Sequence, residues 1–290
     1  QLNLFSNSYK TALNTTDKLR MKKICEENNI PTPNYKNVRN IEILKKLKFN
    51  FPVIVKPTDR SAGRGVALAR NQNELLSRST EAINYSYDGN ILIEEYVDAD
   101  QFSLETISFN GKHHLVSVCK MTFDGPPNFV EYCHHLPANI NKKLLQKMAK
   151  FVDHVLNSFS IRCGASHIEV RLDKDNEVVL IEAASRMGGW RDWMVKSSMN
   201  YDYCKAIMYS SLGEEYLSEL SEKNKVAIAK TIISNDDYDE YYKLRTQYPE
   251  IIVKDLVLGN KLNGIANNLI ECDGPYVICV TKDKAHNILK

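Results

Sequence analysis

Two runs of sequence decide the fold: Ala165-Ser-His-Ile-Glu-Val-Arg-Leu172 and, after the turn 173–176, Glu177-Val-Val-Leu-Ile-Glu-Ala183. Both are rich in β-branched residues, and the short polar turn between them predicts a hairpin. A hairpin would place Glu169 and Glu182 side by side, each interrupting an apolar run.

Two like charges in a partly buried site repel strongly unless a cation lies between them. Mg²⁺ (or Mn²⁺) is the natural cation, because Mg²⁺ takes one or two carboxylates and completes its coordination with water and phosphates. The alternative is a pair of exposed acids, one of them paired with Arg171.

A lysine ends a second apolar strand. Val53-Ile-Val55 leads into Lys56-Pro57 and a loop that contains Ser61, Gly63 and Gly65. An ammonium beside flexible backbone amides suits the phosphates of a nucleotide. The loop does not have the Walker pattern G-x-x-x-x-G-K-[ST]. A surface lysine followed by a simple β-turn would give the same local sequence.

Two further segments carry groups of similar chemistry. The apolar run 91–93 ends in Glu94-Glu-Tyr-Val97, which is either a strand that reaches solvent or a hinge whose backbone meets an adenine edge. Arg186 stands just before Gly188 and Gly189. A planar guanidinium is well suited to hold a transferring phosphoryl group or an acyl phosphate. A surface arginine in a glycine turn is the alternative.

Composition excludes several classes of protein. The 290 residues carry a net charge of +2, with both signs interleaved, so we expect no nucleic-acid surface. We also expect no membrane segment, because no apolar run approaches the ~20 residues that a span needs. The seven cysteines form no C-x-x-C pair, which favours reduced thiols and a cytoplasmic location.

The pattern of periodicities predicts an α+β protein. Helices are expected at 17–29, with Thr16 as N-cap, and at 73–85, 142–159 and 201–212. A hairpin is expected at 102–109 and 115–119, because Asn110-Gly111 suits a tight turn. Beyond 225, strand-like runs at 226–233, 251–258 and 276–281 alternate with polar loops. The strands should therefore be mostly antiparallel.

In this order the motifs resemble the ATP-grasp superfamily, over about residues 14–212. Asp17-Lys18 opens a helix that ends in Ile-Pro-Thr-Pro, and the segments with Lys56, Glu94, Glu169, Glu182 and Arg186 follow in sequence. The resemblance implies an ATP-grasp fold, in which two α+β subdomains clamp ATP between mostly antiparallel sheets. It divides the chain into the end of a preceding domain with a leading helix (1–33), a small lid subdomain (34–97) and a large catalytic subdomain with a β-rich C-terminal extension (98–290).

The resemblance also implies a role for individual residues. Lys18 and Lys56 would contact phosphates, the loop 60–65 would close over them, and Glu105 would lie near the ribose. The residues that would contact the nucleotide are Lys18, Lys56, Arg60, Ser61, Gly63, Gly65, Glu94, Glu95, Tyr96, Val97 and Glu105. Glu169 and Glu182 would hold the metal, and Arg186 with Lys56 would be catalytic. Many family members carry Asn two residues after the second metal glutamate, where this chain has Ala184.

The segment Asn128-Phe-Val-Glu-Tyr-Cys-His-His-Leu-Pro137 resembles the substrate region of bacterial L-amino-acid ligases, the dipeptide-forming branch. There the glutamate, here Glu131, contacts the amino group of the first amino acid, and the histidine, here His134, shapes its pocket. An exposed acidic loop is the alternative. The predicted substrate-binding residues are Glu131, His134, Arg186, Gly188, Gly189 and Trp190.

The expected function is an ATP-dependent carboxylate–amine ligase that forms an amide through an acyl phosphate and releases ADP and phosphate. Its partners would be small-molecule carboxylates and amines, expected to be amino acids, and a homodimer is compatible with the sequence. Two alternatives stay open. One is an ATP-grasp enzyme that activates another acid, of the bicarbonate, carbamoyl-phosphate or carboxylase type. The other is a nucleotide-binding module without catalysis.

Overall fold

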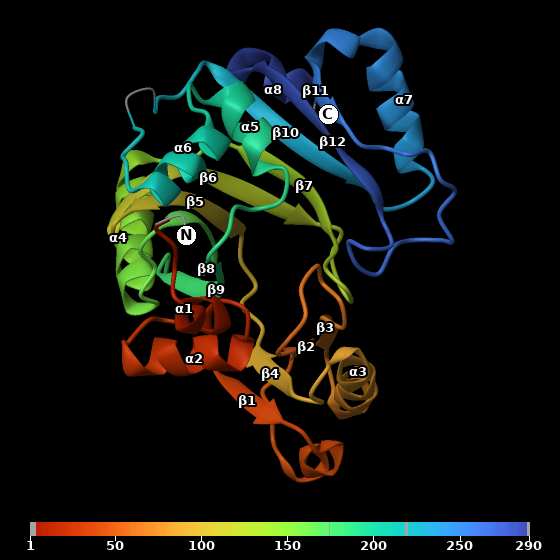
Figure 1. Ribbon diagram of the computed structural model, residues 1–290. Coiled ribbons are helices and arrows are strands. Elements are labelled where there is room, and N and C mark those ends of the chain that lie inside the picture. The colour runs from red at the N-terminus through yellow and green to blue at the C-terminus, as the bar shows by residue number, and fades with distance from the viewer. Residues whose placement is uncertain (1–3, 174, 218–219, 289–290) are drawn as a thin grey trace.

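A computed structural model describes residues 4–173, 175–217 and 220–288 (Figure 1). Its smaller sheet has the strand order β1-β4-β2-β3 and is built from β1 (Tyr35–Val38), β2 (Val53–Pro57), β3 (Ala67–Ala69) and β4 (Ile91–Glu95). Helix α3 (Gln72–Tyr85) packs on it, and a 3₁₀ turn spans Ile41–Lys46. Apolar side chains of the sheet, such as Val55 and Ile93, are buried against α3 residues such as Leu75.

The larger sheet has the strand order β11-β12-β10-β7-β6-β5-β8-β9. Its strands are β5 (Gln101–Phe109), β6 (Lys112–Phe123), β7 (Glu131–Leu136), β8 (Gly164–Leu172), β9 (Val178–Ala184), β10 (Lys225–Ile232), β11 (Ile252–Asp255) and β12 (Asp273–Thr281). Every strand pairing within the described residues is antiparallel. The predicted α+β class is therefore confirmed.

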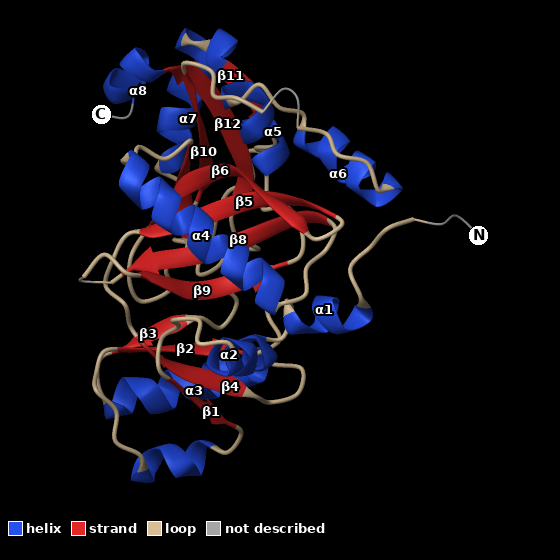
Figure 2. Cartoon of the chain, turned by 90° about the vertical axis from the view of Figure 1, so that its left-hand side faces the viewer, coloured by secondary structure: helices blue, strands red, loops and turns tan. Residues whose placement is uncertain are grey.

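Alternation along the central strands of the larger sheet separates a core face from a site face. Leu104 of β5 and Ile168 of β8 lie in the core formed with α4 (Lys142–Ser158), which crosses one face of the sheet (Figure 2). Because successive side chains of a strand point to opposite faces, Glu105 and His167 face the other side. That side is covered by α5 (Arg191–Ser198) and α6 (Tyr203–Leu212).

The remaining helices lie at the two ends of the chain. Helices α1 (Tyr9–Asn14) and α2 (Lys18–Glu27) precede the smaller sheet, and α7 (Asp237–Gln247), a 3₁₀ turn at Pro249–Ile251 and α8 (Lys282–Ile288) accompany the C-terminal strands. None of the helices in the described residues combines the length and apolar character that a membrane span requires.

Several local predictions are confirmed, and others need correction. The 102–109 hairpin turns at Asn110 and Gly111, whose φ angles are 48° and 85°. The N-cap of α2 is Asp17, not Thr16, because the Asp17 carboxylate accepts from the backbone N–H groups of Leu19 and Arg20. In the expected run 251–258 only Ile252–Asp255 is strand. Helices α5 and α7 were not foreseen, and the turn 173–176 includes residue 174, which lies outside the described residues.

Candidate active site

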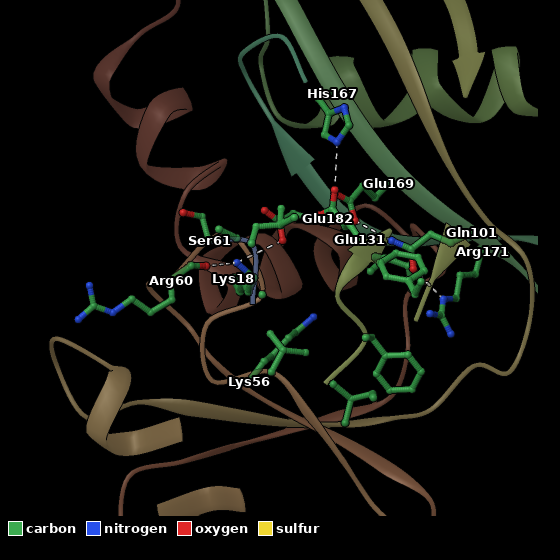
Figure 3. A pocket seen from close by; sticks show the side chains of 18 of the residues that line it. Lys18, Lys56, Arg60, Ser61, Gln101, Glu131, His167, Glu169, Arg171 and Glu182 are labelled. Carbon is green, nitrogen blue, oxygen red and sulfur yellow. Dashed lines mark hydrogen bonds and ion pairs between the residues drawn. The ribbon is translucent and has the colours of Figure 1, made fainter. Parts of the chain in front are cut away.

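A cavity of about 460 Å³ opens between the two sheets, within the range of small-molecule sites. Its lining combines residues of the smaller sheet, the larger sheet and the link between them (Figure 3). Predicted site residues that line it are Lys18, Lys56, Arg60, Ser61, Gly63, Glu94, Glu95, Tyr96, Val97, Glu131, Glu169, Glu182, Arg186, Gly189 and Trp190. Gly65, Glu105, His134 and Gly188 are not among its lining residues.

The two predicted metal glutamates meet across the β8–β9 hairpin. Glu169 and Glu182 are directly paired in the strand register, next to a bulge between Glu169 and Val170. Glu169 accepts a hydrogen bond from Gln101 Nε2 at 2.8 Å and lies 3.2 Å from His167 Nε2. Glu182 Oε2 lies 3.2 Å from Lys18 Nζ. Two carboxylates side by side at the wall of one cavity form a donor set that fits Mg²⁺, which relies on one or two carboxylates plus phosphate oxygens.

Lys18 connects the phosphate loop to the second of these glutamates. Besides its contact with Glu182, the Lys18 ammonium donates to the backbone carbonyl of Arg60 at 2.7 Å. Helix α2 is itself attached to both sheets, because Lys18 N donates to Thr58 O and Leu180 N of β9 donates to Pro31 O. Lys18 therefore lies between the two sheets.

Glu94 pairs with two buried lysines. Its Oε2 lies 2.7 Å from Lys56 Nζ and its Oε1 lies 3.1 Å from Lys22 Nζ. Burial alone would raise the pKa of Glu94, but the ammonium groups of Lys56 and Lys22 lower it below the ordinary value. Lys22 also donates to Thr32 Oγ1 at 2.6 Å. The carboxylate of Glu94 thus fixes Lys56 at the cavity wall, while residues 96–100 form the link to β5.

The predicted phosphate loop packs against elements of the smaller sheet. Gly65 has a φ of +70°, and a Cβ at that position would come within 2.9 Å of Pro57 Cγ, so glycine is required there. The side chain of Arg60 points away from Lys18 (Figure 3) and stacks on the ring of Tyr87. Arg60 contacts Lys18 through its backbone carbonyl and not through its side chain.

Glu105 occupies a place that does not fit the predicted ribose contact. Its side chain is fully buried, with Oε1 2.6 Å from His167 Nδ1 and 3.0 Å from Arg191 Nε. Gly188 N donates to its other oxygen at 3.2 Å. Burial alone would raise the pKa of Glu105, but His167 and Arg191 lower it to about 2. The carboxylate is therefore a buried anion whose partners belong to the protein.

The cavity lining also includes predicted substrate residues. Glu131 begins β7, and its Oε2 lies 3.4 Å from Nε2 of the buried His134. The Trp190 ring packs edge-on against His134, with centroids 5.8 Å apart. Arg186 is exposed at the cavity and donates to Met187 O at 3.0 Å. The structure therefore brings together an anionic and a cationic side chain that could hold the two ends of an amino acid.

Four polar residues of this region were not predicted as site residues: Gln101, His167, Arg191 and Lys22. Gln101 and His167 hold Glu169, Arg191 holds Glu105, and Lys22 holds Glu94. His167 stands two residues before Glu169, so strand alternation could have placed both on one face. Lys22 follows Lys18 by one helical turn, which is a similar signal. Arg191 gave none.

A sequence profile of the ATP-grasp domain matches residues 49–193, half of the chain. This chain is therefore a member of the ATP-grasp family. The match includes Lys56, Glu94, Glu169, Glu182 and Arg186, whose geometry is described above.

Individual relatives are distant. The crystal structure of an L-amino acid ligase from Bacillus licheniformis superposes with a TM-score of 0.81 at 21% identity, covering 99% of this chain and 72% of that one. Alanine–anticapsin ligase of Bacillus amyloliquefaciens is 21% identical over 87% of this chain and 58% of its own length. Carbamoyl-phosphate synthase of Methanobrevibacter smithii is 25% identical over 61% and 47%, respectively. The chain spans about half the length of these two curated relatives.

Proposed function

We propose that this chain is the ATP-binding and catalytic part of a carboxylate–amine ligase that joins amino acids. The observation that carries the proposal is the composition of one cavity. It is lined by the paired glutamates and two lysines, and also by Glu131 and Arg186. The first set suits nucleotide phosphates, and the second suits a zwitterion. The likeness to L-amino acid ligase and alanine–anticapsin ligase supports the same reaction class.

The reaction would run in two steps. A carboxylate oxygen attacks the γ-phosphorus of ATP, the bond to the β–γ bridging oxygen breaks, and ADP leaves. An amine nitrogen then attacks the acyl carbon, phosphate leaves, and the nitrogen loses a proton as the amide forms. Such chemistry depends on positioning and on the neutralisation of phosphate charge.

Each group in the cavity has a place in this scheme. Glu169 and Glu182 would hold Mg²⁺ or Mn²⁺, which supplies positive charge against the terminal phosphates. Lys18 and Lys56 would contact the phosphates, and Arg186 would neutralise the acyl phosphate. Glu131 would bind the ammonium of an amino acid. The closed position of the loop 60–65 would keep water from the acyl phosphate.

Purified protein tests the proposal directly. We expect ADP release from ATP and Mg²⁺ to rise when pairs of L-amino acids are added, and mass spectrometry to show the dipeptide. Glu169→Ala and Arg186→Ala should each lower that rate by on the order of 10²–10³-fold. Near-normal turnover of either variant would overturn the site assignment.

The likeness to carbamoyl-phosphate synthase favours one rival, in which bicarbonate is the activated acid. The same assay separates the two, because stimulation by bicarbonate without amino acids would support the rival. ATP binding without ADP release under either condition would indicate a binding module.

A further inference from the structure

Arg191 is a fully buried cation at the first residue of α5, with an exposed fraction of 1%. Its guanidinium donates to two groups of β5, one of β7 and one backbone carbonyl just before α5. These are Glu105 Oε1 at 3.0 Å, Ser103 Oγ at 3.1 Å, His134 Nδ1 at 3.0 Å and Gly189 O at 3.2 Å. A buried arginine is costly unless its donors are satisfied, so this geometry is tightly determined.

The contact with His134 fixes which imidazole nitrogen carries the proton. A guanidinium can only donate hydrogen bonds, so Nδ1 of His134 must accept from Arg191. His134 is then neutral and carries its proton on Nε2. Burial and the neighbouring Arg191 charge both lower the pKa of His134, which agrees with a neutral ring.

The protonated nitrogen of His134 faces the cavity residue Glu131. His134 Nε2 lies 3.4 Å from Glu131 Oε2, and the side chain of Glu131 is 25% exposed. Within the described residues His134 Nε2 makes no hydrogen bond at this distance, and a small approach of Glu131 would let this neutral N–H orient the carboxylate without cancelling its charge. A protonated imidazole would instead form an ion pair and weaken the attraction of Glu131 for a ligand cation.

A second branch runs from the same guanidinium to the paired glutamates. Arg191 holds Glu105, Glu105 holds His167 at 2.6 Å, and His167 Nε2 lies 3.2 Å from Glu169. Gly188 lies against this branch, because a Cβ there would come within 2.5 Å of His167 Nδ1. Arg191 therefore connects His134, beside Glu131, with His167, beside Glu169, through buried contacts.

We propose that Arg191 is a positioning residue that holds His134 in the Nε2–H tautomer and thereby presents Glu131 as an oriented anion for the ammonium group of an amino acid. Through Glu105 and His167, the same guanidinium fixes the direction of Glu169. The identity of the ammonium ligand rests on the proposed function. The tautomer of His134 and the contacts of Arg191 do not rest on it.

Nitrogen-detected NMR of histidine-labelled protein tests the first step without any substrate. The chain has seven histidines, and His134→Gln identifies the His134 signals by their loss. We expect wild-type His134 to stay neutral with its proton on Nε2 from about pH 6 to about pH 8. An Nδ1–H tautomer or a charged ring in the folded protein would overturn the proposal.

Arg191→Lys tests whether the guanidinium sets that tautomer. Lysine keeps a cation beside Glu105, but one ammonium does not reproduce the fork that reaches Ser103 and His134 together. We expect an unchanged circular dichroism spectrum and His134 signals that show exchange between both tautomers. A single Nε2–H tautomer in the folded variant would show that Arg191 does not set it.

A pair of His134 variants keeps the test decisive if Arg191→Lys does not fold. Gln places an amide N–H near the position of Nε2, whereas Asn reaches only the position of Nδ1. With an equimolar mixture of the L-amino acids as probe, we measure the half-saturating concentration and the maximal rate of ADP release.

The Asn variant should raise the half-saturating concentration at least about tenfold, the Gln variant less than about threefold, and the maximal rate should change less in both. Equal shifts in both variants would mean that His134 only fills space. If the mixture does not stimulate the wild type, the proposed function fails, and the NMR result still decides the tautomer.

Discussion

Two sets of charged residues, named here for their proposed roles as the phosphate end (Lys18, Lys56, Glu169 and Glu182) and the amine end (Glu131, His134 and Arg191), are held in different ways. At the phosphate end, the contacts cross between subdomains: Lys18 of α2 joins the carbonyl of Arg60 to Glu182 of the larger sheet. At the amine end, Arg191 and His134 are buried, and Glu105 and His167 extend the same network to Glu169. The phosphate end must change whenever the sheets move relative to each other. The contacts of the amine end do not cross between the sheets, so we expect them to be preassembled.

The largest expected effect distinguishes two lysines that share the carboxylate of Glu94. Lys56 lines the cavity and Lys22 does not. Lys56→Met should lower ATP-dependent ADP release by on the order of 10²-fold, because a cation beside the phosphates is lost. Lys22→Met should lower the maximal rate by less than about tenfold, since Lys56 still pairs with Glu94.

Maximal rates and thermal unfolding of both variants, measured side by side, check this prediction. Equal losses of rate would mean that Lys56 acts only as a structural partner of Glu94, and that the phosphate end is fixed in the same way as the amine end.

A smaller effect is expected from two neighbouring glycines. Alanine at Gly188 would bring its Cβ within 2.5 Å of His167 Nδ1, 2.8 Å of Arg191 Cγ and 2.9 Å of Glu105 Oε1. We expect Gly188→Ala to lower the free energy of unfolding by about 2 kcal/mol, because overpacking disturbs a buried ionic cluster. Gly189→Ala meets nothing within 4 Å and should change stability by less than about 0.5 kcal/mol.

Urea unfolding of both alanine variants measures the difference. A Gly188→Ala protein as stable as Gly189→Ala would show that the buried network can relax, and the amine end would then not be preassembled in the sense described above.

The same contrast explains which parts of the site the sequence could predict. Glu169 and Glu182 could be paired because strand alternation and a short turn are local rules, and the register confirms that pairing. Lys56 could be placed at the end of its strand for the same reason. These groups depend on short-range geometry.

The buried network depends on contacts between distant segments, and no local pattern shows them. Arg191 and Glu105 are 86 positions apart, and Arg191 and His134 are 57 apart. The resemblance placed Glu105 near the ribose because of its position in the order of motifs. Its burial depends on α5, a helix that the sequence did not predict. Segment 131–136 was not predicted as a strand; β6 precedes it in the chain, but its other pairing partner, β10, is distant in sequence.

The smallest expected effect concerns a contact between the C-terminal extension and the phosphate loop. Leu269 lines the cavity, and its N–H donates to Ala62 O at 3.2 Å. Trypsin can cleave after Arg64 only when this loop opens. Leu269→Gly should raise the cleavage rate at Arg64 about fivefold, because losing a half-buried leucine side chain weakens the closed state by ~1 kcal/mol.

Ile270→Gly is the matched control, since Ile270 is 68% exposed and glycine adds the same backbone freedom. If both variants are cleaved at the same rate, the Leu269 side chain does not hold the loop, and its other contacts, such as that of Lys18 Nζ with Arg60 O, determine its mobility.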